Sequence, residues 1–137
     1  MTTLIIGSSG LVGRNLAPRL LQEGESIVCM DLHMELTPDL PGATMVQGDV
    51  SNLTDVSETI QRFKPDCIIN LAYLVGRKAC LQDLNRTLRV NILGMDNVFR
   101  ASVDEDVSRV IWASTLGVYS SIDYEPGLVV TEEHPRP

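Results

Sequence analysis

Three glycines near the N-terminus have the spacing of a loop that holds a phosphate. Gly7, Gly10 and Gly13 form the pattern Gly-x-x-Gly-x-x-Gly directly after the short apolar run 3–6. In such a loop the first glycine permits a tight turn, the second lets backbone approach a pyrophosphate, and the third allows close helix–strand packing. The N-terminus of the following helix supplies free amides and partial positive charge. The pattern therefore predicts a site for a phosphate-containing ligand.

A carboxylate follows at the distance that dinucleotide-binding proteins use. Asp31 lies 18 residues after Gly13 and closes the apolar run 26–30. A carboxylate at this place accepts hydrogen bonds from both hydroxyl groups of an adenosine ribose, and it repels a 2′-phosphate. Asp31 therefore favours NAD over NADP, although Arg14 and His33 are nearby cations that could accommodate a phosphate.

The elements that must position these residues alternate between strands and helices. Short apolar runs rich in β-branched residues predict strands over 3–6, 26–30, 43–47, 66–70 and 109–113. Helical spacing of apolar residues predicts helices over 10–23, from an Asn52 cap with Asp55 three positions on to about 64, and over about 81–103. Pro18 is a misfit inside the first helix, where it costs about 3 kcal/mol unless the helix adapts.

This order predicts one α/β domain over residues 1–137, with a further short helix near Leu36 as an open alternative. Buried strands that alternate with amphipathic helices form a parallel sheet covered on both faces. Right-handed crossovers then favour a doubly wound sheet of five strands in the order 3-2-1-4-5, the Rossmann fold. A ligand of such a sheet lies at the carboxyl ends of the strands, where Gly7 and Asp31 stand.

Six motifs follow one another along the chain. They are Gly7–Gly13, Asp31, Gly48–Val50, Asn70–Tyr73, Asn91–Val98 and Ala113–Tyr119. Together they resemble the extended branch of the short-chain dehydrogenase/reductase superfamily, the NAD-dependent epimerase/dehydratase family. The resemblance covers essentially the whole chain. It implies an NAD(P)-binding Rossmann domain of enzymes that transfer a hydride between a substrate carbon and the nicotinamide.

The resemblance also implies where the cofactor lies. Asp49 would bind the adenine amino group and Val50 would pack on the adenine ring, while the segment after the fourth strand would line the cofactor. The cofactor-binding candidates are Gly7, Gly10, Leu11, Val12, Gly13, Asp31, Leu32, Asp49, Val50, Leu71, Ala72 and Tyr73.

The catalytic candidates come from the same resemblance. Thr115 lies four residues before Tyr119, where the family places the hydroxyl that hydrogen-bonds the reacting substrate oxygen, and Ser114 would support it. Alternatively, the Thr115 hydroxyl only forms a hydrogen bond with neighbouring backbone at the end of the strand. Asn91 matches the asparagine of a proton relay, and helix packing is an equally good interpretation of that residue.

The family's catalytic Tyr-x-x-x-Lys pair is absent from this sequence. Residues Tyr73, Tyr119 and Tyr124 are followed four positions on by Arg77, Asp123 and Leu128. The stretch 130–137 resembles the acidic, proline-containing loop that precedes the catalytic tyrosine. We therefore expect the N-terminal part of a longer enzyme, inactive by itself. An edge strand and an uncovered helix would then make the chain self-associate.

Composition and charge disfavour other functions. The 137 residues are 44% hydrophobic and 21% charged, and 11 basic against 18 acidic residues give a net charge of −7. This charge argues against nucleic-acid and anionic-membrane partners. No run approaches the length of a membrane span and no basic leader precedes the first strand, so we expect a cytoplasmic protein. Cys29 and Cys67 lie in apolar runs and predict buried free thiols, and no metal-ligand spacing is present.

Three functional hypotheses follow. The favoured one is the NAD-binding part of an epimerase, dehydratase or reductase that acts on a sugar-nucleotide-like or other hydroxyl or carbonyl substrate. The second is a non-catalytic dinucleotide-binding sensor or interaction module. The third is a flavodoxin-like nucleotide-binding domain, which explains the sheet but not Asp49, Asn91 and the motif 114–119.

Overall fold

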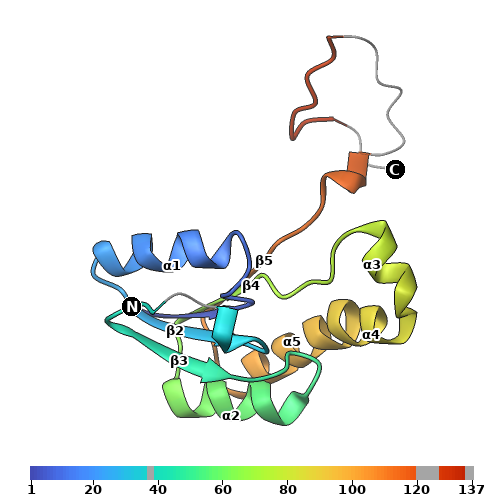
Figure 1. Cartoon of the computed structure of the whole chain (residues 1–137). Coiled ribbons are helices and arrows are strands. Elements are labelled where there is room, and N and C mark those ends of the chain that lie inside the picture. The colour runs from blue at the N-terminus through green and yellow to red at the C-terminus, as the bar shows by residue number, and fades with distance from the viewer. Residues whose placement is uncertain (37–38, 120–126, 135–137) are drawn as a thin grey trace.

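A five-stranded parallel sheet forms the centre of the computed structural model (Figure 1). The structure describes residues 1–36, 39–119 and 127–134. The strands of the sheet are β1 (Thr2–Ile6), β2 (Ser26–Asp31), β3 (Ala43–Gln47), β4 (Cys67–Asn70) and β5 (Arg109–Trp112). Their order is β3-β2-β1-β4-β5, and each neighbouring pair is parallel. The predicted doubly wound Rossmann fold is confirmed.

Helices cover both faces of the sheet. They are α1 (Gly13–Gln22), α2 (Leu53–Phe63), α3 (Arg77–Gln82), α4 (Leu84–Leu88), the π-helical turn η2 (Arg89–Leu93), α5 (Gly94–Asp104) and the 3₁₀ turns η1 (Met34–Leu36) and η3 (Leu116–Tyr119). In Figure 1, α1 lies on one side of the strands and α2 on the other. The open alternative of a short helix near Leu36 is confirmed as the 3₁₀ turn η1.

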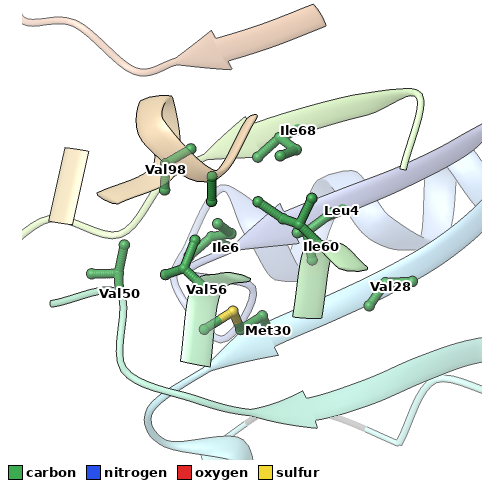
Figure 2. Close-up of a cluster of buried hydrophobic side chains, with 10 residues drawn as sticks. Leu4, Ile6, Val28, Met30, Val50, Val56, Ile60, Ile68 and Val98 are labelled. Carbon is green, nitrogen blue, oxygen red and sulfur yellow. The ribbon is translucent and has the colours of Figure 1, made fainter. Parts of the chain in front are cut away.

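Alternation along the strands builds two separate cores. Leu4 and Ile6 of β1 point to the face covered by α2 and α5, where they meet Ile60 and Val98 (Figure 2). Ile5 points to the opposite face and packs with residues under α1. Because the central strands are buried on both faces, their sequences read as continuous apolar runs rather than alternating ones.

The first helix begins three residues later than predicted. Residues up to Val12 form a turn, in which the Gly10 amide donates to the Gly7 carbonyl over 3.3 Å, and α1 starts at Gly13. The expected start at Gly10 is therefore wrong, because the glycines favour a loop over helix nucleation. Pro18 does lie inside α1, which continues through it.

Most of the long helix predicted over about 81–103 is confirmed, as the continuous run of α4, η2 and α5 from Leu84 to Asp104, but its predicted start is wrong. The helical region begins earlier, at Arg77, and breaks at Asp83. Asp83 is extended (φ −143°, ψ 87°), and its carboxylate accepts a hydrogen bond from the Arg86 amide over 2.9 Å. An aspartate that caps a new helix interrupts the preceding one, because its backbone must leave the helical region. The helix then runs through η2 into α5.

The predicted cap of α2 is confirmed. The Asn52 side-chain oxygen accepts from the Thr54 amide over 3.0 Å, and the Asn52 amide group donates to Asp55 over 2.8 Å. The buried thiols are confirmed as well: burial raises the pKa of both Cys29 and Cys67, which keeps them neutral. Within the described ranges, no helix has the length and apolar character needed to cross a bilayer.

Candidate functional site

The glycine-rich turn is fixed at the carboxyl end of β1. Gly7 has a φ of +84°, and its amide donates to the Met30 carbonyl of β2 over 2.9 Å. A Cβ added to Gly7 would lie 2.6 Å from the Ala72 nitrogen, and one added to Gly13 would lie 2.6 Å from the Ser8 Cα. Both positions therefore require glycine, which confirms the predicted tight turn and close helix packing.

The turn leaves backbone donors for an anion. In the described part of the chain, the amides of Leu11 and Val12 donate to no other residue, and both side chains are exposed. These amides precede α1, whose N-terminus carries partial positive charge. Unpaired amides at a helix N-terminus are the usual donors to a phosphate.

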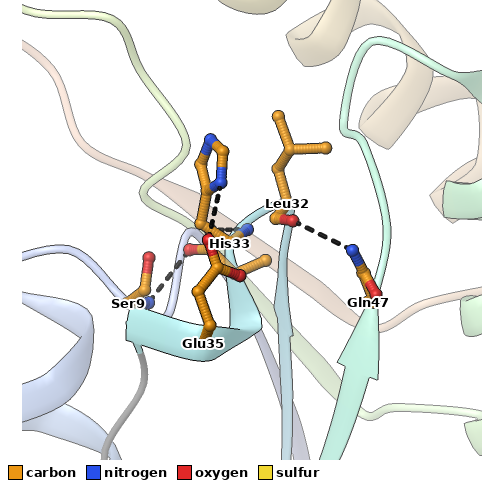
Figure 3. Close-up of polar contacts among 6 residues, drawn as sticks. Ser9, Leu32, His33, Glu35 and Gln47 are labelled. Atoms are coloured by element: carbon orange, nitrogen blue, oxygen red, sulfur yellow. Dashed lines mark hydrogen bonds and ion pairs between the residues drawn. The ribbon is translucent and has the colours of Figure 1, made fainter.

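Asp31 holds the end of β2 against this turn, through contacts with Ser9 and His33, whose positions Figure 3 shows. One carboxylate oxygen accepts from the Ser9 amide over 2.9 Å, and the other accepts from the His33 amide over 3.0 Å. The His33 ring in turn contacts the Glu35 carboxylate at 3.1 Å. Each Asp31 oxygen has a second lone pair, so the carboxylate retains capacity for two further donors.

The turn after β3 is held from several sides. The Asp49 amide donates to Asp55 over 2.8 Å, and one Asp49 carboxylate oxygen accepts from the Ser51 amide over 2.8 Å. The Val50 carbonyl accepts from the Asn97 side chain over 3.0 Å. Val50 itself is buried in the core beneath α5. The turn therefore presents one carboxylate on a rigid support.

The segment after β4 is clamped by the π-helical turn η2. The Asn91 side-chain oxygen accepts from the Leu74 amide over 2.8 Å, and its amide group donates to the Leu74 carbonyl over 3.0 Å. Nearby, the Tyr73 hydroxyl contacts the Met95 sulfur at 3.6 Å. Both polar groups of Asn91 are thus engaged with backbone, as the packing interpretation of this residue predicts. A relay role for Asn91 stays a prediction.

These segments enclose one cleft of about 210 Å³ at the carboxyl ends of the strands. In-register pairing of Ile6 with Met30 and Asn70 brings the ends of β1, β2 and β4 to the same edge. Nine of the twelve cofactor-binding candidates line the cleft: Gly7, Gly10, Asp31, Leu32, Asp49, Val50, Leu71, Ala72 and Tyr73. Leu11, Val12 and Gly13 are outside the lining and belong to the adjoining turn and helix start.

The catalytic candidates do not line this cleft. Ser114 and Thr115 follow β5 as exposed residues, and the Thr115 hydroxyl accepts from the Gly117 amide over 3.0 Å. This local bond is the alternative that the sequence left open for Thr115. Their roles toward a substrate stay predictions. In the part of the chain that the structure describes, no three His, Cys, Asp or Glu side chains form a group that could hold a metal.

The cofactor-binding candidates predicted from the sequence leave out seven residues that line the cleft, although His33 is one of the nearby cations already named, and Ser9 and Gly48 lie inside predicted motifs. The seven are Ile6, Ser9, His33, Gly48, Leu74, Arg86 and Val90. Most of these residues are adjacent in the chain to a predicted motif residue. They could have been predicted from their place at the carboxyl end of a strand. Arg86 and Val90 come from α4 and η2, and only the tertiary fold brings them to the cleft.

A sequence model of the NAD dependent epimerase/dehydratase family matches residues 3–136. The match extends over almost the whole chain, from β1 to the stretch after η3. This chain belongs to the NAD-dependent epimerase/dehydratase family. The extended short-chain dehydrogenase/reductase resemblance read from the six motifs is thereby confirmed.

Individual relatives agree with this family. Short-chain dehydrogenase/reductase family 42E member 1 of Homo sapiens is 31% identical over 121 residues, which cover 85% of this chain and 30% of that protein. CDP-paratose 2-epimerase of Salmonella typhi is 26% identical over 132 residues, 90% of this chain and 39% of that protein. The chain thus spans about a third of the length of these two relatives.

Solved structures share the fold. UDP-glucose 4-epimerase of Thermus thermophilus, in complex with NAD, has a TM-score of 0.86 at 24% identity, covering 100% of this chain and 44% of that one. The enzyme WbmG of Bordetella bronchiseptica, in complex with NAD, has a TM-score of 0.78 at 25% identity, covering 87% of this chain and 39% of that one. The chain therefore has the Rossmann fold of the epimerases.

Proposed function

We propose that this chain binds NAD in the cleft at the carboxyl ends of β1, β2, β3 and β4. The observation that carries the proposal is the convergence of nine candidates from four separate strand ends on one cleft. The glycine-rich turn would hold the pyrophosphate through its backbone amides. Asp31 would accept from the ribose hydroxyls, and Asp49 and Val50 would receive the adenine.

The charge at the ribose end supports NAD as the preferred dinucleotide. Asp31 already accepts one amide on each carboxylate oxygen, which fixes its orientation toward the cleft. A 2′-phosphate placed on this carboxylate would meet like charge in a partly buried position. His33 and Arg86 also line the cleft. These two side chains do not change the fact that a 2′-phosphate would have to approach the negatively charged Asp31 carboxylate.

We further propose that a protein containing this domain transfers a hydride between NAD and a hydroxyl or carbonyl substrate, with sugar nucleotides as the favoured class. NAD supplies the hydride acceptor when bound. Thr115, supported by Ser114, would hydrogen-bond the reacting oxygen. The 137 residues contain no Tyr-x-x-x-Lys pair, so we expect this chain alone to bind NAD without turning over substrate. A cytoplasmic location stays a prediction.

Isothermal titration calorimetry of the chain with NAD and with NADP tests the binding proposal. We expect saturable binding of one NAD, at least roughly tenfold tighter than NADP at equal ionic strength. Equal affinity for both dinucleotides would contradict the role of Asp31, and the absence of NAD binding would contradict the proposal itself. A tight NAD complex together with NAD-dependent turnover by this chain would contradict the expected inactivity.

The absence of the Tyr-x-x-x-Lys pair also supports the second hypothesis, a non-catalytic dinucleotide-binding module. The two hypotheses differ in what the natural reading frame encodes. If the intact protein from its source has a mass well above 15.1 kDa and carries a downstream Tyr-x-x-x-Lys, the enzyme hypothesis holds. If its mass is 15.1 kDa, the binding module takes its place.

We also propose that the isolated chain self-associates through a second copy of itself. Leu84, Leu88 and Ile92 recur every four residues along α4 and η2, and each is more than half exposed. Such a strip lies on one side of the helical segment. Contiguous exposed apolar surface of this kind drives association in water.

Replacing Leu88 with glutamate is expected to shift the chain toward a monomer. The charge would have to be buried in the interface, which costs far more than leaving it in water. Sedimentation velocity over a range of concentrations measures the effect, and Leu53→Glu, at an exposed leucine on α2, is the matched control. A wild-type mass of 15.1 kDa at every concentration would contradict self-association.

A further inference from the structure

We propose that Asn97 and Gly94 of α5 are positioning residues that set the preference of the cleft for adenine over other purines, by fixing the Asp49-Val50 turn. The proposal rests on the proposed function, because it assumes that the adenine of NAD lies against this turn. Neither residue lines the cleft. Their effect would therefore pass through the turn rather than through a contact with the ligand.

Asn97 is a buried polar residue whose hydrogen bond reaches a distant part of the chain. It is 9% exposed, and its side-chain amide group donates to the Val50 carbonyl, 47 positions away, over 3.0 Å. Asn97 lies inside α5, one turn after Gly94. A buried carbonyl that loses its donor must find water or move. Asn97 thus fixes the backbone of the turn at Val50.

Gly94 holds the same residue by its side chain. A Cβ at Gly94 would lie 2.9 Å from one Val50 methyl carbon and 3.2 Å from the other. The missing side chain therefore lets α5 approach until Val50 is nearly sealed, at 5% exposed. Figure 2 shows Val50 in the same cluster of buried side chains as Val98, which lies on α5. The backbone and the side chain of Val50 are thus both fixed by one helix.

The neighbouring carboxylate depends on this support. Asp49 is held from the other side by α2, where its amide donates to Asp55, and one of its oxygens accepts from Ser51. No described residue donates to the second Asp49 oxygen, so that oxygen is available to a ligand. Because Asp49 and Val50 share a peptide unit, a shift of Val50 moves the Asp49 backbone, and the carboxylate with it.

The chemistry at this oxygen discriminates between purines. Adenine carries an amino group at position 6, which donates to a carboxylate, whereas hypoxanthine carries a carbonyl oxygen there and would meet the carboxylate as a second acceptor. A fixed carboxylate therefore rejects hypoxanthine, and a loose one can turn away from it. The ratio of the affinities for NAD and for nicotinamide hypoxanthine dinucleotide reports how firmly the turn is held.

Calorimetric titration of both dinucleotides into wild type and Asn97→Ala tests the proposal. We expect wild type to prefer NAD by roughly tenfold, the effect of a hydrogen bond to a charged group. Asn97→Ala should lower this ratio by about threefold or more. The matched control is Ser102→Ala, which removes the bond from another buried side chain of α5 to the Val98 carbonyl without touching the turn. Its ratio should equal that of wild type.

A merely structural role would give a different result. If Asn97→Ala weakened the binding of both dinucleotides by the same factor, the positioning role would be overturned. The same would follow if Ser102→Ala lowered the affinity ratio as much as Asn97→Ala does. If Asn97→Ala does not fold, Gly94→Ala replaces it, because the added methyl displaces Val50 from the same side; an unchanged ratio there would overturn the proposal as well. Wild type that binds neither dinucleotide would refute the proposed function, and this inference with it.

Discussion

Replacing Asp31 with alanine is expected to weaken NAD binding by about 100-fold or more, the equivalent of losing two hydrogen bonds to a charged acceptor. The same change should leave NADP affinity unchanged or raise it, because it removes the charge that a 2′-phosphate would face. The ratio of the two affinities, measured by calorimetry, separates these effects from general damage. General damage, such as a loosened glycine-rich turn, would instead weaken the binding of both dinucleotides by a similar factor.

Glu35→Ala is the matched control for the Asp31 prediction. Glu35 is an exposed carboxylate four residues further along the chain, and its contact is with His33. Removing it deletes the same charge near the cleft without removing an acceptor from the lining. NAD affinity should therefore change little. If Glu35→Ala changed the NAD-to-NADP ratio as much as Asp31→Ala, the ratio would report net charge rather than a ribose contact.

Replacing Gly7 with alanine is expected to lower the free energy of unfolding by about 3 kcal/mol and to abolish NAD binding. The added Cβ would lie 2.6 Å from the Ala72 nitrogen and 2.7 Å from the Leu71 carbonyl carbon, both backbone atoms. The φ of +84° adds strain for any residue with a side chain. Relief would require the end of β1 to move away from the segment after β4.

Gly24→Ala separates the two causes of this loss. Gly24 has nearly the same φ, +86°, but an added Cβ would meet nothing within 4 Å. It should therefore cost only about 1–2 kcal/mol of conformational strain. Urea unfolding of both variants measures the difference. Equal losses for Gly7→Ala and Gly24→Ala would contradict the close backbone approach at Gly7.

Local patterns were sufficient to predict the strand ends that carry the candidate site. Gly7, Asp31 and Asp49 each follow a short apolar run, and in a parallel sheet such positions share one edge. Turn chemistry made the Asn52 cap predictable as well. These features depend on neighbouring residues, so periodicity and residue type were enough to locate them.

Long-range packing explains what could not be predicted. The bond from Asn97 to Val50 joins residues 47 positions apart, and no local pattern predicts which carbonyl a buried asparagine meets. The break at Asp83 was missed because apolar residues continue at helical spacing on both sides of it, while its own cap ends the first helix. Arg86 lines the cleft from α4, the helix that begins after this break.

The location of bound NAD on the chain tests the central claim most directly. Backbone amide chemical shifts, followed by NMR during an NAD titration, report that location residue by residue. We expect saturable shifts at Ser9, Gly10, Asp31 and Val50, around the cleft, and none at Arg109, at the opposite end of the strands. Shifts that cluster at Arg109, or an unchanged spectrum at saturating NAD, would contradict the assignment of this cleft as the dinucleotide site.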